Sequence, residues 1–379
     1  MSEVKKVLYI RSAPYEINFD NYNLQEVGLG KAFCNEGYDF DIVYYTKGKN
    51  REQTIDVPKN HLRIFWRKGI RILRSGIYPE IYDKKFLNRY DIVIASEYGQ
   101  IMSVILSDRY PNTYLYNGPY YNLFKIPFIE PVYDFLFCKK LNKNMRKVFC
   151  KTEMAKEFIA EKGITNSSVV GVGLDTAKFD AEKEIKPETE ALLEKMSGHR
   201  NFLYIGSISK RKNVELIIKA FVKLKQKDNT DDIQLVIVGK GSKSYTDFCR
   251  SLLPEELSKS VIWCEFIENA QTQFLYKSAD VFLLPSVQEI FGMVLLETMY
   301  FQTPAISSHS AGAGTLIKSG ENGIIIDNFD EQNWADQMYE LINDECKVKI
   351  LGQNAGQTIK NEFTWDKIAK KMLKDINLN

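Results

Sequence analysis

Residues 280–297 read "DVFLLPSVQEIFGMVLLE" and contain a pattern that indicates the fold class. The opening run, "DVFLLPS", is short, apolar and closed off by a proline, which predicts a buried β-strand. A helix is expected to begin near Gly292, so the segment has the strand–loop–helix form of a βαβ unit. Two carboxylates interrupt the apolar residues, Glu289 in the loop and Glu297 in the helix. What these carboxylates bind is the main functional question.

Similar apolar runs alternate with amphipathic helical stretches along the whole chain. Before residue 180, strands are expected in "KVLYIR" (6–11), "FDIVYYT" (40–46), "YDIVIAS" (90–96), "TYLYNG" (113–118) and "KVFCKT" (147–152). After residue 200, they are expected in "NFLYIGS" (201–207), "IQLVIVGKG" (233–241), "VIWCEFI" (261–267), "DVFLLPS" (280–286), "PAISS" (304–308) and "GIIID" (323–327). This alternation predicts an α/β fold with two Rossmann-like βαβ domains, each built on a parallel sheet.

The length of 379 residues fits two domains of roughly 150–200 residues each. A polar, charged stretch separates the two series of strands, and a final amphipathic helix follows the second series. The predicted organisation is an N-terminal domain (1–180), a linker with a short helix (181–200), a C-terminal domain (201–360) and a terminal helix (361–379) that packs back on the N-terminal domain.

The composition, 44% hydrophobic and 26% charged, is typical of a globular protein. No apolar run reaches the ~20 residues of a membrane span, and "MSEVKKVLYIR" lacks the apolar core of a signal peptide, which predicts a cytoplasmic protein. The six cysteines include no C-x-x-C pair and are expected to be reduced, four of them in the core. Only three histidines are present, which disfavours a histidine-based metal site or catalytic triad.

Open parallel sheets bind ligands at the carboxyl ends of their strands, which makes the loop before Gly292 a candidate site. Backbone amides at a helix start suit a phosphate, and here they belong to Phe291, Gly292, Met293 and Val294. Because a carboxylate repels phosphate but accepts hydroxyl groups, Glu289 and Glu297 would bind a sugar and a ribose. A nucleotide-sugar carries both around a diphosphate. The alternative reading is that Glu289 stabilises the helix start and Glu297 is an exposed helix residue.

A second strand end, in "YIGSISKRKNVELIIKAF" (204–221), adds cations to this picture. Lys210, Arg211 and Lys212 lie between Gly206 and a helix expected to begin near Asn213. Three cations at this place would neutralise a diphosphate, although each alone fits a solvated surface charge. The run "VIVGKG" (236–241) lacks the third glycine and the acidic residue of a dinucleotide fingerprint, which disfavours a nicotinamide-dependent dehydrogenase.

With these motifs in this order, the chain resembles the retaining glycosyltransferases of family 4 (glycosyl transferases group 1), which have the GT-B architecture. The most specific part is Glu289-x7-Glu297 inside "PSVQEIFGMVLLETMYFQTPAISS" (285–308). "GVGLDTAKF" (171–179) and "FTWDKIAKK" (363–371) also follow the family's order. The resemblance implies two domains that face each other across a cleft and a terminal helix that crosses back to the first.

The resemblance also implies roles for individual residues. Glu289 would contact the donor sugar, Glu297 the ribose and Lys212 the diphosphate. Ser207 stands where the family usually has an arginine, so Arg211 or Lys210 would replace that cation. The implied catalytic residues are Glu289, Lys212 and Arg211. The other implied donor-binding residues are Gly206, Ser207, Lys240, Gly241, Phe266, Ile267, Phe291, Gly292, Met293, Val294 and Glu297.

The acceptor side departs from the family pattern. The stretch "FDNYN" (19–23) lacks the family's glycines, and Asn117 stands where many members carry a histidine. The acceptor-side candidates are Asn21, Tyr22, Asn117 and Tyr120.

The implied reaction moves a hexose-type sugar from a UDP-sugar, or less favoured a GDP-sugar, to a glycan acceptor with retention of configuration. We expect no metal and no other cofactor, because the donor domain has no Asp-x-Asp motif and fixed cations and amides would stabilise the leaving group. The implied setting is bacterial-type cell-surface polysaccharide or glycoconjugate assembly. Two alternatives remain open: a sugar-nucleotide hydrolase or epimerase on the same fold, and a two-domain sugar-binding protein without catalysis.

Two stretches of the N-terminal domain, 63–78 and 122–147, combine basic with aromatic or apolar residues. Such segments suit the anionic inner face of the cell membrane and a lipid-linked acceptor. The alternative is an ordinary core helix with a solvated basic end. Nucleic acid is not an expected partner, because the net charge is only +2 and no recognised binding module is present.

Overall fold

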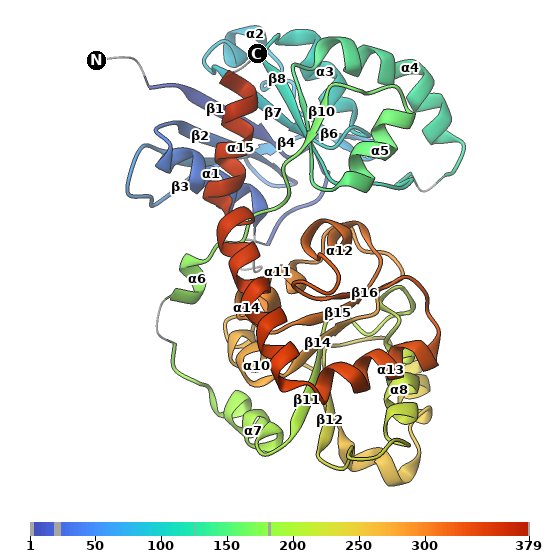
Figure 1. Ribbon diagram of the computed structural model, residues 1–379. Coiled ribbons are helices and arrows are strands. Elements are labelled where there is room, and N and C mark those ends of the chain that lie inside the picture. Colours follow the sequence, from blue (N-terminus) through green and yellow to red (C-terminus); the bar gives the residue numbers. More distant parts are fainter. Residues whose placement is uncertain (1–3, 19–23, 125, 181–182, 378–379) are drawn as a thin grey trace. The chain divides into compact units, whose positions relative to one another are not determined.

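The computed structural model describes residues 4–18, 24–124, 126–180 and 183–377 (Figure 1). The chain divides into two compact units: unit 1 is Met1–Asp175 with Thr364–Asn379, and unit 2 is Thr176–Phe363. The division falls at Asp175, ahead of the predicted linker. Within 181–200, residues Pro187–Met196 form helix α7, which packs against α10 (Thr272–Ser278) in unit 2.

Unit 1 is built on a mostly parallel sheet with the strand order β10-β9-β8-β7-β1-β2-β4-β3. Only the pairing of β3 with β4 is antiparallel in this sheet, as far as the described residues show. The strands are β1 (Lys6–Ile10), β2 (Asp39–Thr46), β3 (Arg51–Ile55), β4 (Leu62–Lys68), β7 (Ile92–Ser96), β8 (Thr113–Asn117), β9 (Val148–Cys150) and β10 (Ser167–Val169). The five strands expected before residue 180 are confirmed.

The other strands of unit 1, namely β3, β4, β10, β5 (Ile70–Ile72) and β6 (Ser75–Ile77), were not predicted, and β3 and β5 lack the signal of a buried strand. Strand β3, "REQTI", is polar and exposed, so it lacks the apolar run that marks a buried strand. Strands β5 and β6 form a separate antiparallel hairpin. All three residues of β5 are exposed.

The helices of unit 1 include one from the far end of the chain. They are α1 (Gln25–Asn35), α2 (Lys84–Leu87), α3 (Ile101–Arg109), α4 (Ile129–Asn144), α5 (Glu153–Glu161) and α15 (Trp365–Asn377). Figure 1 shows α15 beside α1, with which it packs. Trp365 fits there because two glycines leave space: a Cβ on Gly28 would lie 2.2 Å from its Nε1, and a Cβ on Gly173 would lie 2.6 Å from its Cα.

Unit 2 contains a fully parallel sheet with the order β13-β12-β11-β14-β15-β16. Its strands are β11 (Arg200–Ile205), β12 (Ile233–Val238), β13 (Val261–Cys264), β14 (Val281–Leu284), β15 (Ala305–Ser308) and β16 (Ile324–Ile326). Every residue of β12 and β14 is buried, as expected for strands covered by helices on both faces. The six strands expected after residue 200 are confirmed.

The helices of unit 2 pack in pairs around this sheet. They are α6 (Ala177–Asp180), α7, α8 (Val214–Leu224), α9 (Lys243–Ser251), α10, α11 (Met293–Tyr300), α12 (Ala311–Leu316), α13 (Glu331–Ile342) and α14 (Glu345–Glu362). Helix α8 packs on α13, and α11 packs on α14. Four of the six cysteines are buried and all six are reduced, which confirms that prediction. Within the described residues, no helix combines the length and apolar character that a membrane span requires.

Candidate active site

The loop between β14 and α11 has an unusual backbone that the sequence explains. Its last residue, Gly292, has φ 79° and ψ 74°, a left-handed conformation that favours glycine. A Cβ at this position would also lie 3.3 Å from Cγ of Glu289. The neighbouring strand β15 fixes the start of the loop, because the Ser308 hydroxyl donates a 2.6 Å hydrogen bond to the carbonyl of Ser286. The loop is thus held at both ends.

The carboxylate of Glu289 is bound by the cations that follow β11. The Lys212 ammonium donates a hydrogen bond to Oε2 of Glu289, and Nη1 of Arg211 lies 3.6 Å from the same oxygen. The side chains of Lys212 and Glu289 are only 12% and 14% exposed, so their attraction is weakly screened by water. Together these three groups carry one net positive charge, which suits an anionic ligand.

The backbone of Arg211 positions this cluster as well. The Val287 amide donates to the carbonyl of Arg211 at 2.9 Å. In return, Nη1 of Arg211 donates to the carbonyl of Gln288 at 2.7 Å. The three residues predicted to be catalytic are therefore brought together by two loops that bind each other, at the ends of adjacent strands.

Glu297 lies inside α11 and is 3% exposed. Its Oε2 accepts a 2.9 Å hydrogen bond from the hydroxyl of Tyr276 on α10. The reading of Glu297 as an exposed helix residue is wrong, because its side chain is buried. Burial of a carboxylate is costly unless it is hydrogen-bonded, and Tyr276 supplies that bond. Tyr276 was not predicted, since nothing in the sequence around it links it to Glu297.

The ends of β11 and β12 approach each other closely because glycines occur there. A Cβ on Gly239, which has φ 150°, would lie 1.8 Å from the carbonyl oxygen of Gly206. A Cβ on Gly241 would lie 2.2 Å from the carbonyl oxygen of Ile208. The Ile208 amide donates to the carbonyl of Lys240 at 2.8 Å, which continues the pairing beyond the strands. The predicted residues Gly206, Ser207, Lys240 and Gly241 therefore line one edge of the sheet.

The predicted residues after β13 extend this edge. Phe266 is 65% exposed, whereas Ile267 is buried. The Lys240 ammonium lies 5.7 Å from the centroid of the Phe266 ring. An exposed ring beside a cation offers a surface on which a nucleotide base can stack. Along the sheet, each strand end contributes a different feature: an aromatic ring after β13 and glycine-rich backbone after β12. Cations follow β11, and a carboxylate follows β14.

The start of α11 is shaped by a contact that the sequence did not reveal. Gly312 lies on α12, and a Cβ there would be 1.7 Å from the carbonyl oxygen of Phe291. The first turn of α11, with Met293 and Val294, follows directly. Its N–H groups point along the helix axis toward the N-terminal end, where the helix dipole is positive. The predicted amide donors thus belong to the end of the loop and the first turn of α11, and Gly312 allows α12 to approach that loop end.

Of the four acceptor-side candidates, the structure describes Asn117 and Tyr120. Asn117 is fully buried, accepts a 3.1 Å hydrogen bond from the Tyr98 amide and donates one of 3.2 Å to the Pro119 carbonyl. Its side chain holds backbone together and presents no surface to a substrate. Tyr120 is partly buried, with its ring 5.0 Å from that of Tyr121. Asn21 and Tyr22 lie outside the described residues.

A polar cavity of about 290 Å³ in unit 1 was missed by the sequence analysis. Arg11, Glu97 and Lys151 line it, and they follow β1, β7 and β9 directly. Glu26, on α1, binds Nη1 of Arg11 at 3.2 Å in the same cavity. The signal was present, because each of the first three is a charged residue at the carboxyl end of a parallel strand.

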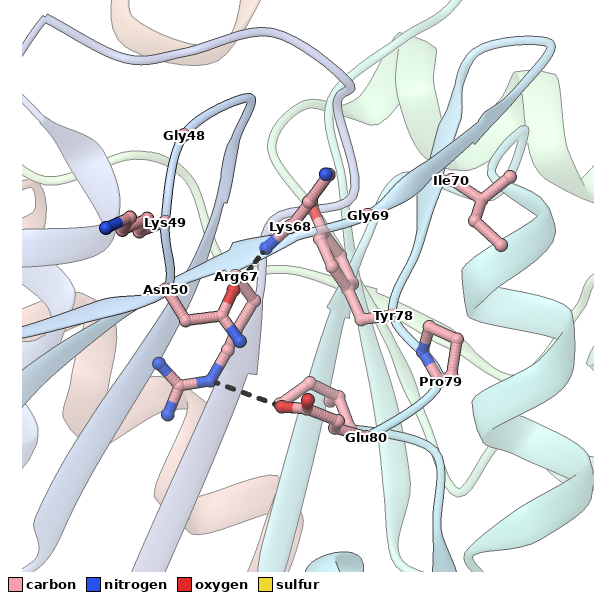
Figure 2. A pocket seen from close by; sticks show the side chains of 11 residues that line it. Gly48, Lys49, Asn50, Arg67, Lys68, Gly69, Ile70, Tyr78, Pro79 and Glu80 are labelled. Carbon is pink, nitrogen blue, oxygen red and sulfur yellow. Dashed lines mark hydrogen bonds and ion pairs between the residues drawn. The ribbon is translucent and has the colours of Figure 1, made fainter.

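A second cavity in unit 1, of about 610 Å³, lies where β4 leads into the β5–β6 hairpin (Figure 2). Figure 2 shows the guanidinium of Arg67 directed toward Glu80, with 4.0 Å between Nε and the carboxylate. The amide of Lys68 donates to the side chain of Asn50 at 2.8 Å. Lys49 and Lys68 are exposed, and among the described residues no carboxylate lies within 4 Å of either ammonium group.

The described residues contain no group of three or more histidine, cysteine, aspartate or glutamate side chains arranged to hold a metal ion.

Residues 186–358 match the sequence model of the family "Glycosyl transferases group 1". Over these residues the chain is similar to that family. The matched region contains every residue predicted for the donor site, from Gly206 to Glu297.

Curated relatives with glycosyltransferase names are similar to this chain. An uncharacterized glycosyltransferase of Methanocaldococcus jannaschii is 32% identical over 173 residues, which are 45% of this chain and 42% of that protein. The chain thus spans less than half the length of this relative. Another uncharacterized glycosyltransferase of that organism is 22% identical over 361 residues, 90% of each chain.

Two solved structures show the fold of the whole chain. Sucrose-phosphate synthase from Thermosynechococcus elongatus has a TM-score of 0.73 and 16% identity, covering 99% of this chain and 98% of that one. HepE from Anabaena, in complex with UDP and glucose, has a TM-score of 0.69 and 15% identity, covering 99% and 100%. The fold is therefore the GT-B type that the resemblance implied.

Proposed function

We propose that the protein is a glycosyltransferase that moves a hexose-type sugar from a nucleotide-diphosphate-sugar to a glycan acceptor. The observation that carries this proposal is the cluster of Lys212, Arg211 and Glu289 at the ends of β11 and β14. A UDP-sugar is the favoured donor, supported by the UDP complex of the structurally similar HepE. A GDP-sugar is the second choice.

The cluster suits a diphosphate leaving group. Lys212 is oriented by Glu289 before any ligand arrives, so little reorganisation is needed when the diphosphate binds. Once the diphosphate takes the positive charge of Lys212 and Arg211, the Glu289 carboxylate can accept hydroxyl groups of the donor sugar. Glu297, held by Tyr276, accepts the ribose hydroxyls.

The proposed reaction retains the anomeric configuration and uses no metal. The acceptor hydroxyl attacks the anomeric carbon on the face from which the diphosphate leaves. The carbon–oxygen bond to the diphosphate breaks, the new glycosidic bond forms, and a diphosphate oxygen takes the acceptor proton. Lys212, Arg211 and the first-turn amides of α11 stabilise the charge that develops on the leaving group.

We further propose that the acceptor is lipid-linked and that unit 1 attaches to an anionic membrane surface, in the assembly of a cell-surface glycan. Helix α4 supports this, because Phe135 is 86% exposed and Val132 and Leu136 are more than half exposed. Exposed apolar side chains of this size on one helix mark an interaction surface. Lys139 and Lys143 follow on the same helix and are also exposed.

The decisive experiment is a thermal-shift screen against UDP, GDP, ADP and their sugar conjugates. A ligand at 100 times its dissociation constant should add about 2.7 kcal/mol to the free energy of unfolding. We expect a selective rise in melting temperature with one nucleotide, lost in Glu297→Ala and kept in Glu321→Ala, a control on an exposed carboxylate of unit 2. The absence of any shift would contradict the donor site.

A further inference from the structure

Unit 1 contains two cavities that share a wall. The polar cavity of about 290 Å³ adjoins a second cavity of about 420 Å³, and both are lined by Ala13, Tyr15, Glu97 and Gln100. The volumes, taken together, are in the range of small-molecule sites. The two cavities differ in chemistry, because charged side chains predominate in the first and apolar side chains in the second.

The polar cavity matches a ring with several hydroxyl groups. Glu26 is 9% exposed, is bound by Arg11 at 3.2 Å and accepts a 3.2 Å hydrogen bond from Tyr44. The half-buried Lys151 donates to the side chain of Gln25 at 2.8 Å and lies 4.8 Å from the ring centroid of Tyr116. Carboxylates and cations in one small cavity accept from and donate to hydroxyl groups at the same time.

Glu97 stands between the two cavities in a strained backbone conformation. Its φ is 58°, which is unfavourable for any residue except glycine and a few others. Its carboxylate accepts hydrogen bonds from Arg74 at 3.1 Å and from Gln100 at 3.2 Å. Such strain persists only where the surrounding structure enforces it, and it is concentrated at functional sites.

The second cavity, here called the apolar cavity, is lined mostly by apolar and aromatic residues, together with Arg71, Arg74, Glu97 and Gln100. It is lined by Leu73, Phe124, Ile126 and Ile129, and half of the Leu73 surface is exposed. Phe128, which directly precedes Ile129 in the chain, is 70% exposed. An apolar cavity that continues onto an apolar surface fits a hydrocarbon chain, whose burial is favourable by ~0.8 kcal/mol per CH₂.

Arg71 supplies a cation at the border of this apolar cavity. Its side chain is exposed, and among the described residues no carboxylate lies within 4 Å of its guanidinium. The neighbouring Arg74 is already bound to Glu97. Arg71 is therefore available for an anionic group, and a guanidinium binds the oxygens of a phosphate in a bidentate manner.

We propose that the two cavities together bind the acceptor, a long-chain lipid phosphate that carries a sugar. The hydrocarbon chain lies in the apolar cavity, the phosphate binds Arg71, and the sugar occupies the polar cavity beside Glu26, Glu97 and Lys151. This inference rests on the proposed function, whose donor site lies in unit 2, and it names the class of the second substrate.

Binding in the absence of any donor tests the proposal. The probe is farnesyl phosphate below its critical micelle concentration, measured by titration calorimetry with the full chain. Farnesol and inorganic phosphate serve as the two single-ended controls. We expect farnesyl phosphate to bind at least ten times more tightly than either control, because only it fills the apolar cavity and reaches Arg71.

Two variants locate the binding. Arg71→Gln should weaken farnesyl phosphate binding about tenfold and leave farnesol binding unchanged. Leu73→Asn should weaken both, and it tolerates the left-handed backbone of Leu73, whose φ is 51°. Arg146→Gln, at an exposed arginine outside these cavities, should change neither.

Equal binding of inorganic phosphate would mean a free anion site only and would overturn the proposal. Unchanged affinity in Arg71→Gln would overturn it as well. If nucleotides shift the melting temperature but farnesyl phosphate does not bind, the acceptor inference fails and the donor site stands. If farnesyl phosphate binds and no nucleotide shifts the melting temperature, the proposed transferase function fails instead.

Discussion

Lys212 and Glu289 form a hydrogen-bonded ion pair across 77 positions of the sequence. The pair exists because β11 and β14 are neighbours in the sheet, so the loops that follow them lie at the same edge. Both side chains are largely buried, and removing either one leaves an incompletely compensated charge. The pair therefore combines a structural with a proposed catalytic role.

Replacing either partner should abolish most of the sugar transfer. We expect Lys212→Ala and Glu289→Gln each to lower kcat by roughly 10²-fold or more, since fixed charges at a reacting centre contribute on this scale. Initial rates with the donor found in the thermal-shift screen would measure the effect. Lys219→Ala is the matched control, because it breaks an exposed ion pair with Glu331 in the same unit. A Glu289→Gln enzyme with nearly full activity would contradict the role assigned to Glu289.

The hydrogen bond from Tyr276 to Glu297 should tune nucleotide affinity. In Tyr276→Phe, the ring remains and the 2.9 Å hydrogen bond to Glu297 is lost, so Glu297 is less firmly oriented. Since one hydrogen bond to a charged group contributes about 1.5–3 kcal/mol, the nucleotide dissociation constant should rise by about tenfold or more. Calorimetric titration measures this directly. An unchanged dissociation constant would show that Glu297 does not depend on Tyr276.

Gly312 should be intolerant of any side chain. Its Cβ would lie 1.7 Å from the Phe291 carbonyl oxygen, so Gly312→Ala must displace α12 or the loop that leads to Gly292. We expect a loss of about 1–3 kcal/mol in the free energy of unfolding, together with weaker nucleotide binding. Gly320→Ala is an informative comparison, because that glycine has open space around it but a φ of 84°. Gly320→Ala should lower the free energy of unfolding and leave nucleotide binding unchanged.

The exposed apolar face of α4 should mediate vesicle binding. Phe135 is the most exposed aromatic residue of α4, and Phe135→Asp replaces its ring with a carboxylate. We expect it to reduce flotation with anionic liposomes at least several-fold, by removing buried apolar area and adding repulsion. Lys49→Ala, in the cavity of Figure 2, should reduce flotation less and mainly at low salt. Flotation that does not depend on anionic lipid would favour the alternative of a solvated basic helix end.

Buried thiols should make the protein less stable at alkaline pH. Burial raises the pKa of Cys34, Cys138 and Cys150 to about 12, and that of Cys249 to about 11. In the unfolded chain these thiols ionise near ~8.5, so above that pH the folded state binds more protons than the unfolded state. The free energy of unfolding should therefore fall as pH rises from about 8.5 toward 11.

Urea denaturation under reducing conditions at pH 8 and pH 10 measures this effect. The exposed Cys346 provides the control, because Cys346→Ala should leave the pH dependence unchanged. A free energy of unfolding that is flat or rising across this range would contradict the assignment of protonated, buried thiols.

The sequence was sufficient to predict strands that are buried on both faces and the charged residues that follow them. Strands such as "IQLVIV" and "VFLL" are continuous apolar runs, and the charged residues after β11 and β14 follow from strand-end chemistry. The exposed strand β3 carries no such signal, so its pairing with β4 could not be foreseen.

The rest of the site depends on contacts between distant segments. Tyr276 binds Glu297, and Gly312 approaches Phe291, only because α10 and α12 lie beside α11 or its preceding loop in three dimensions. Asn117 shows the opposite case, in which a sequence pattern suggested a site residue that the structure buries. A family pattern placed it near the acceptor, whereas its hydrogen bonds to backbone groups bury it completely.

The position of α15 affects how the protein can be made. As a nascent chain leaves the ribosome, β1 and α1 emerge before unit 2, but the tryptophan that fills the space beside Gly28 and Gly173 is synthesised only after all of unit 2. Unit 2 can fold during translation, while unit 1 must wait with an apolar helix face uncovered. The N-terminal half should therefore be the one that needs a chaperone during synthesis, although it is made first.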